Sequence, residues 1–226
     1  MKSLPPGQKE IKEFPRFGLP KFTNRFPSVT QSLELSIGGD LEDFVLSDPL
    51  SGMSTVQQTS DFHCVTTWSK LDLQWSGVRF SDFYKAYISP KAQDMYLSFV
   101  VFKSQDGYKT SLPLKDLLRD DVLLADGLGN KPLCIAHGAP LRLVAPDHYG
   151  YKNPKHLHRI EFYKEAQKLK SGLARIIDHP RGRVAHEERA NFAAGWMLRI
   201  PYKAGINKTI KDYQEALDKH LEKLAQ

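Results

Sequence analysis

Residues 61–70 read Asp-Phe-His-Cys-Val-Thr-Thr-Trp-Ser-Lys, and Cys64 within them is one of only two cysteines in the 226-residue chain. A lone intracellular cysteine in a β-prone stretch is more often a small core residue than a reactive thiol. The polar residues that follow it are unfavourable to bury unless their hydrogen bonds are satisfied. These residues are Thr66, Thr67, Ser69 and Lys70. His63 and Lys70 would also favour the thiolate if they pointed toward the sulfur, so both interpretations of Cys64 remain open.

A second segment, residues 137–157, places Arg142, Lys152 and Lys155 around two turns that contain Gly and Pro. A solvated basic loop after a strand is one interpretation of this segment. The other is an anion-binding site. In such a site Arg supplies a planar group with two parallel hydrogen-bond donors, Lys supplies a point charge, and the backbone amides of the turns supply further donors. The residues alone favour neither interpretation.

The composition is that of a globular protein, with 41% hydrophobic and 26% charged residues. It excludes a disordered tail, a collagen and a disulfide-stapled miniprotein. No apolar run approaches the roughly 20 residues of a bilayer helix, so we expect no membrane span. The N-terminus lacks an apolar leader, and two cysteines cannot form a disulfide framework, so we expect a cytoplasmic protein. The net charge of +6 is spread out and does not indicate nucleic-acid binding.

The hydrophobic patterns predict a single α+β domain with mixed β-sheet layers and short helices. Leu33, Leu35 and Ile37 alternate with polar residues and predict a strand, which Gly38-Gly39 should end in a turn. Further strands are expected at 59–68, 96–102, 122–125 and 141–145, and helices from Ser81, over 112–118, over 163–177 and over 208–225. The last helix carries an apolar stripe of Tyr213, Leu217, Leu221 and Leu224, which predicts packing on the body or on a partner.

Three parts follow from these patterns. Residues 1–31 hold five prolines and should form an extended N-terminal arm, which its four phenylalanines would dock on the body. Residues 32–162 form the body. Residues 163–226 are expected to be a helical C-terminal extension of the same domain.

Several blocks, in order, resemble the sulfite oxidase-type molybdopterin-dependent oxidoreductases. They are His-Cys-Val-Thr-Thr-Trp-Ser-Lys (63–70), Trp-Ser-Gly-Val (75–78), Gly-Tyr-Lys-Thr-Ser-Leu-Pro-Leu (107–114), Val-Leu-Leu-Ala (122–125) and His-Gly-Ala-Pro-Leu-Arg-Leu-Val-Ala-Pro (137–146). Leu-Pro-Pro-Gly-Gln (4–8) and Glu-Phe-Pro (13–15) resemble the haem-free bacterial members. The resemblance covers about residues 4–162 and implies that family's molybdopterin-binding fold.

The resemblance also implies roles for particular residues. Cys64 would be the single protein thiolate on molybdenum, beside the dithiolene of one molybdopterin, since only a deprotonated soft sulfur coordinates such a metal. His137 would hydrogen-bond the cofactor, and Arg142 and Lys155 would neutralise its phosphate. The remaining predicted cofactor contacts are Asn153 and Pro154, through backbone atoms, and His63, Thr66 and Ser69 beside the thiol.

The implied function is two-electron oxygen-atom transfer, either sulfite-like oxidation of a small oxo-anion or sulfoxide-like reduction, with a separate electron-transfer partner. The substrate arginines of the haem-containing enzymes have no clear match, and Arg16, Lys21 and Arg25 are the candidates. Residues 172–175 read Gly-Leu-Ala-Arg where the haem-free members have Gly-Phe-Trp-Glu. The alternative is a non-catalytic descendant of the fold that binds a partner through its helical tail.

Other metal sites are less well supported. A zinc site from Cys134, His137, His63 and Cys64 is disfavoured, because adjacent residues of a strand point to opposite faces. Cys134 is then expected to be a core thiol. His186-Glu187-Glu188-Arg189 resembles the start of a zinc-protease helix, but position 190 is Ala rather than the second histidine.

Overall fold

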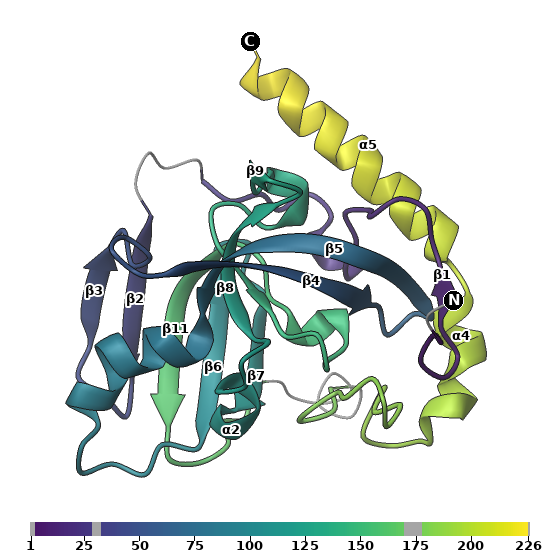
Figure 1. Cartoon of the computed structure of the whole chain (residues 1–226). Coiled ribbons are helices and arrows are strands. Elements are labelled where there is room, and N and C mark those ends of the chain that lie inside the picture. The colour runs from purple at the N-terminus through teal and green to yellow at the C-terminus, as the bar shows by residue number, and fades with distance from the viewer. Residues whose placement is uncertain (1–2, 29–32, 170–177, 226) are drawn as a thin grey trace.

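The computed structural model describes residues 3–28, 33–169 and 178–225. In these ranges the strands form two mixed sheets joined by short helices, and a long C-terminal helix lies to one side (Figure 1). The architecture is therefore α+β, as the sequence predicts.

The first sheet is built around the long strand β5 (Trp68–Arg79). One edge of β5 pairs antiparallel with β4, while the other pairs parallel with the short strand β1 and antiparallel with β8. The other strands of this sheet are β1 (Lys9–Glu10), β4 (Thr55–His63), β8 (Leu123–Leu128), β9 (Lys131–Pro132) and β10 (Arg142–Val144).

The second sheet has the order β3-β2-β11-β6-β7. Its central strand β11 is parallel to β2, with Ile160 opposite Ile37, and antiparallel to β6. The bounds are β2 (Glu34–Gly39), β3 (Phe44–Ser47), β6 (Phe99–Ser104), β7 (Lys109–Pro113) and β11 (Leu157–Tyr163).

Apolar residues cover both faces of the first sheet. The main core contains Val78 and Leu124, whereas their neighbours Leu123 and Trp75 belong to a second cluster on the opposite face. A strand buried on both faces reads as a continuous apolar run, which explains Val-Leu-Leu-Ala at 122–125. The second cluster receives Phe14 from the N-terminal arm, so that the arm covers this face of the sheet.

The helices are short except for the last. The α-helices of the described ranges are α1 (Phe80–Phe83), α2 (Leu114–Leu117), α4 (Arg199–Lys203) and α5 (Ile206–Leu224). A π-helical turn spans Tyr84–Ile88, and 3-10 turns span Pro20–Phe22, Ser89–Lys91, Ile135–His137, Gly150–Lys152 and Gly195–Leu198. Across the described ranges, none of the helices combines the length and the apolar character that crossing a bilayer requires.

The predicted C-terminal helix is confirmed as α5, which lies beside the N-terminal arm in Figure 1. Tyr213 and Leu217 of the apolar stripe are buried, and the Tyr213 hydroxyl donates to Leu19 O at 2.8 Å. Leu221 and Leu224, further along the same stripe, are exposed. The first half of the stripe therefore packs on the arm.

The helix predicted over 163–177 is wrong for its described part, residues 164–169, which form no helix; residues 170–177 lie outside the described ranges. Tyr163 still belongs to β11, and the amide of Lys164 donates to Asp40 Oδ2 at 2.8 Å. Sheet pairing of Tyr163 and the bond from Lys164 to Asp40 fix the chain at the start of this stretch, and these tertiary contacts override the local helical propensity. Gly38 and Gly39 also differ from prediction, since they end β2 and the chain turns after them.

The stretch 59–68 is not one strand. β4 ends at His63, the chain reverses over Cys64–Thr67, and β5 begins at Trp68. The Thr67 amide donates to Cys64 O at 3.2 Å, and Thr67 takes a left-handed φ of 77°. The polar residues after Cys64 therefore occupy a hairpin turn, which we call the Cys64 turn (residues 64–67).

Gly77→Ala should destabilise the fold, because a Cβ there would lie 2.6 Å from the Ala125 Cα and would also meet the Leu124 carbonyl. We expect a loss of about 1–3 kcal/mol in the free energy of unfolding, typical of overpacking, measured by urea denaturation. The exposed neighbour Gln74→Ala on the same strand serves as the control and should be near neutral. Equal urea midpoints for Gly77→Ala and Gln74→Ala would contradict the close approach of β5 and β8 at Gly77.

Candidate functional site

A cavity of about 630 Å³ lies where the N-terminal arm, the Cys64 turn, the loop after β9 and the C-terminal segment meet. Cys64 and Thr66 line it, together with His137, Arg142 and Lys155. The structure thus brings together residues up to 91 positions apart that the sequence singled out separately.

The Cys64 turn presents its thiol to this cavity. The Cys64 amide donates to Trp68 O at 2.8 Å, which closes the hairpin, and Thr66 Oγ1 lies 3.1 Å from Cys64 Sγ. Burial raises the pKa of the Cys64 thiol to about 11, although the Thr66 hydroxyl acts in the opposite direction. In the protein without cofactor the group is therefore a thiol at pH 7, and coordination to a metal would have to displace its proton.

His63 and Ser69 do not line the cavity. Ser69 Oγ donates to Gln8 Oε1 at 3.0 Å, so it accepts from His63 Nδ1 at 2.7 Å. Gln8 Nε2 in turn donates to Cys64 O at 3.1 Å. This buried chain of hydrogen bonds ties the Cys64 turn to the arm; a direct cofactor contact by His63 or Ser69 remains a prediction.

Arg142 and Lys155 bring positive charge to the cavity. Arg142 is 1% exposed, donates from Nη1 to His137 O at 2.8 Å, and has its guanidinium carbon 4.8 Å from the Trp75 ring centroid. Lys155 Nζ donates to Ala136 O at 3.3 Å. Among the described residues neither cation forms a salt bridge with Asp or Glu. Gly138, with a left-handed φ of 116°, allows the loop to pass close to both side chains.

Burial without a salt-bridge partner changes how these groups titrate, although the charge of Asp106 acts in the opposite direction on Lys155. Burial lowers the pKa of Arg142 to about 9. Burial, reinforced by the charges of Arg142 and Arg16, lowers the pKa of Lys155 to about 7. Burial and the charges of Arg142 and Lys155 also lower the pKa of His137 to about 4, so this ring is neutral at pH 7. A bound anion would restore favourable charge balance.

Two buried ring nitrogens on the cavity wall also lack partners. Trp68 Nε1 and His137 Nδ1 have no hydrogen-bond partner within the described residues. The His137 ring stacks on Phe14 of the arm, with ring centroids 4.6 Å apart. The cavity thus offers a thiol, cations without salt bridges, polar atoms without hydrogen-bond partners and aromatic walls. These groups suit an anionic cofactor that has a flat ring system and a metal bound by sulfur.

The arm residues suggested as substrate arginines differ in position. Arg16 lines the cavity but donates to Thr23 O at 2.8 Å and to Arg25 O at 3.0 Å. Its guanidinium also packs on the Tyr213 ring of α5 at 4.7 Å. Lys21 lies on the cavity rim and is exposed, and Arg25 is exposed and does not line the cavity. Much of the hydrogen-bonding capacity of Arg16 is therefore used to hold the arm and α5 together.

Asn153 and Pro154 line the cavity, but their polar groups also support the fold. The Asn153 side chain accepts from Ala145 N at 2.6 Å and donates to His148 O at 3.1 Å. The Pro154 carbonyl accepts from Leu143 N at 3.0 Å. These bonds hold the loop against β10, and backbone contacts to a cofactor remain a prediction.

Sequence reasoning missed Gln8 and Arg189 as supports of the site. Gln8 lies in a block that the family resemblance includes, yet its bond to Cys64 O depends on how the arm docks. Arg189 lies in the run weighed only as a zinc-protease motif; it is fully buried and lines the cavity.

Cys134, expected in the core, is exposed. No group of three or more His, Cys, Asp or Glu side chains in the described part of the chain is placed to hold a metal ion.

The chain is similar in sequence to bacterial oxidoreductases. The chain is 41% identical over 110 residues to the uncharacterized oxidoreductase YuiH of Bacillus subtilis, a match that covers 48% of this chain and 53% of YuiH. It is 26% identical over 182 residues to the protein-methionine-sulfoxide reductase catalytic subunit MsrP of Xanthomonas axonopodis, covering 69% of this chain and 56% of MsrP. The chain thus spans about half the length of these curated relatives.

The fold is also found in a solved structure. The sulfane dehydrogenase SoxCD from Paracoccus pantotrophus superposes with a TM-score of 0.52 at 18% identity, covering 67% of this chain and 44% of that chain. This similarity shows a shared fold.

The family model of the oxidoreductase molybdopterin binding domain matches residues 24–170. The chain therefore belongs to this family of molybdopterin-binding oxidoreductases. Its cofactor is accordingly molybdopterin carrying molybdenum, and the charge and donors of the cavity fit that group.

Sulfate should bind the cofactor-free protein more tightly at pH 6 than at pH 8. Sulfate keeps its charge over this range, whereas Lys155 loses its proton as the pH rises through about 7. Above that pH, Lys155 must take up a proton when sulfate binds. We therefore expect the affinity for sulfate to fall by about tenfold by pH 8, measured by titration calorimetry.

Lys155→Met provides the control for this pH dependence. It should bind sulfate weakly at both pH values, with little change between them. Equal sulfate affinity of the wild-type protein at pH 6 and pH 8 would show that Lys155 does not contact the anion.

Proposed function

We propose that this protein catalyses two-electron oxygen-atom transfer on a small oxo substrate at a molybdenum centre ligated by Cys64. The observation that carries the proposal is the Cys64 thiol at a cavity that also holds Arg142 and Lys155 without carboxylate partners. The bound molybdenum-molybdopterin would supply the redox chemistry, and the protein supplies binding, orientation and charge.

Each part of the cavity has a role in this proposal. Cys64 Sγ provides the protein thiolate, and the Cys64 turn determines its direction. Arg142 and Lys155 neutralise the cofactor phosphate, since charge-assisted hydrogen bonds are strongest where water is excluded. Trp68 Nε1 and His137 Nδ1 would satisfy polar atoms of the pterin. Phe14, which packs 5.0 Å from Phe62 between ring centroids, helps to exclude water from this side.

We favour a sulfoxide-type substrate, reduced to a thioether. Such a reduction takes up two electrons and two protons and releases water. Support comes from the relatives named protein-methionine-sulfoxide reductases, which match up to 69% of this chain. Sulfite-like oxidation, in which water supplies the oxygen and two electrons leave, is the alternative direction.

The electrons would come from a separate partner protein. The relatives of the MsrP type are named catalytic subunits. A second function, partner binding by the helical tail without catalysis, has less support, because Tyr213 and Leu217 are already buried in the chain's own fold. Only Leu221 and Leu224 of the stripe are exposed.

Metal and pterin analysis tests the proposal directly. Protein purified from cells that make molybdopterin should carry close to one molybdenum and one releasable pterin per chain. The readouts are mass spectrometry for the metal and fluorescence of the oxidised pterin. Metal-free and pterin-free protein from such cells would contradict the proposal.

Cys64→Ser should keep the fold and the pterin but abolish turnover, because the thiolate ligand to the metal is lost. The assay follows a reduced dye with methionine sulfoxide as substrate, and an oxidised dye with sulfite. Cys134→Ser is the matched control, since Cys134 is exposed and does not line the cavity. Wild-type rates in Cys64→Ser would refute the role of Cys64; turnover of sulfite alone would reverse the direction proposed above.

A further inference from the structure

Arg189 is a buried cation from the C-terminal segment that reaches the Cys64 turn. Its side chain is fully buried and lies on the wall of the cavity that holds Cys64. It comes from residues 178–190, far from Cys64 in sequence and outside the blocks that resemble the family. A fully buried arginine needs specific hydrogen bonds or charge partners, because its charge is costly to remove from water.

The contacts of Arg189 join three separate parts of the chain. Nη1 donates to Val65 O within the Cys64 turn, and Nη2 donates to Pro6 O of the arm at 3.3 Å. Nη2 also lies 3.5 Å from Glu187 Oε1 of its own segment. The planar fork of one guanidinium thus spans two backbone carbonyls, which a single ammonium group does not match in geometry.

The surroundings leave this guanidinium little freedom. Its carbon lies 5.1 Å from the Tyr149 ring centroid, and its Nε is buried with no hydrogen-bond partner among the described residues. Gly7 of the arm leaves room for two arginines, since a Cβ at Gly7 would lie 2.5 Å from Arg199 Nε and 3.1 Å from Arg189 Nη2. Glu187 is held in turn by Arg199, through bonds of 2.9 and 2.7 Å.

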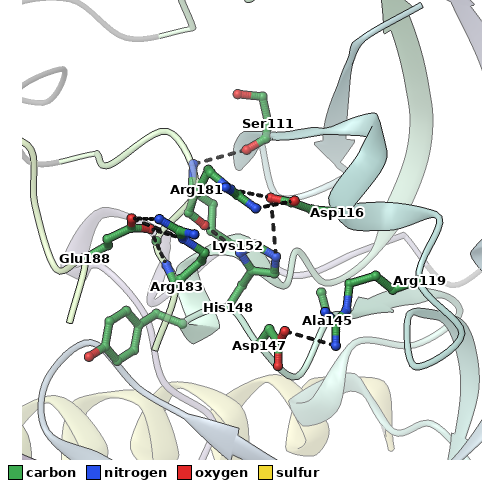
Figure 2. A network of polar contacts seen from close by, with 12 residues as sticks. Ser111, Asp116, Arg119, Ala145, Asp147, His148, Lys152, Arg181, Arg183 and Glu188 are labelled. Atoms are coloured by element: carbon green, nitrogen blue, oxygen red, sulfur yellow. Dashed lines mark hydrogen bonds and ion pairs between the residues drawn. The ribbon is translucent and has the colours of Figure 1, made fainter. Parts of the chain in front are cut away.

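The segment that carries Arg189 is anchored elsewhere by its own contacts (Figure 2). Arg181 donates from Nε to Asp116 Oδ2 at 2.7 Å, which ties the segment to α2. Arg183 pairs with Glu188, and Tyr149 N donates to Gly182 O at 2.8 Å. These anchors do not involve the Cys64 turn, so holding the segment and holding the turn are separable roles.

We infer that Arg189 is a positioning residue that holds the Cys64 turn by clamping Val65 O to the arm. The inference deepens the proposed function, in which Cys64 ligates molybdenum, because the clamp determines where the thiol points. Gln8 of the arm holds the same turn through Cys64 O. The turn is thus held by one side chain from the arm and one from the C-terminal segment.

The test measures protection of the Cys64 thiol in the full-length, cofactor-free protein, so it does not depend on molybdenum binding. Iodoacetamide alkylation of Cys64 is compared with that of the exposed Cys134 in the same molecules by peptide mass spectrometry. Arg189→Lys keeps the positive charge but loses the planar guanidinium group, and Arg189→Met loses both the charge and the hydrogen-bond donors. Circular dichroism checks that each variant is folded.

We expect both Arg189 variants to alkylate Cys64 about tenfold faster than wild type relative to Cys134, as loss of a hydrogen bond from a charged donor implies. A role of Arg189 through charge alone predicts the opposite pattern. A nearby cation favours the reactive thiolate, so Arg189→Met would then slow alkylation and Arg189→Lys would match wild type.

Arg181→Gln is the matched control, because it loosens the same segment at α2 without touching the Cys64 turn. It should change the alkylation ratio by less than about twofold if local anchoring is independent of the turn. An effect of Arg181→Gln as large as that of Arg189→Lys, or rescue of protection by lysine, would overturn the inference. Failure to find molybdenum in the purified protein would bear only on the proposed function.

Discussion

The site depends on positive charge that the protein buries without neutralising it. Arg142 and Lys155 line the same cavity as the Cys64 thiol, and no Asp or Glu in the described ranges forms a salt bridge with either. Burial of this kind destabilises the protein until an anion arrives, as the lowered pKa values of both groups indicate. The cavity is therefore organised for an anionic cofactor, and the fold tolerates the cost because the two sheets provide a large core.

Much of the body could be predicted from sequence, because its signals are local. Each of three patterns indicates which faces of a single helix or strand are buried. They are the alternation at 33–37, the apolar run at 122–125 and the amphipathic stripe of the last helix. Residues 164–169 show the limit: they follow Tyr163, which pairs with β6, and the Lys164 amide is bound by Asp40, so the helix that their composition favours does not form. The turn at Cys64 was hidden for a related reason, since threonines suit both strands and turns.

The same contrast applies to the site. Cys64, His137, Arg142 and Lys155 lie in blocks that a family resemblance can identify, and the structure gathers them around one cavity. His63 and Ser69 lie in the same motif but form hydrogen bonds behind it with Gln8. Arg189 carries no local signal, because its role arises only when the C-terminal segment docks against the arm. Residues that line the cavity were thus easier to single out from the sequence than the residues that support its walls.

The parts of the wall around the cavity come from both early and late regions of the chain. The arm and the Cys64 turn lie within residues 3–67, whereas Tyr202 and Tyr213 of the wall lie more than 130 positions later. The wall is therefore complete only when these two regions are folded against each other. Separation of α5 from the arm would open the Tyr213 side of the cavity, and with it the surroundings of the buried thiol, to water.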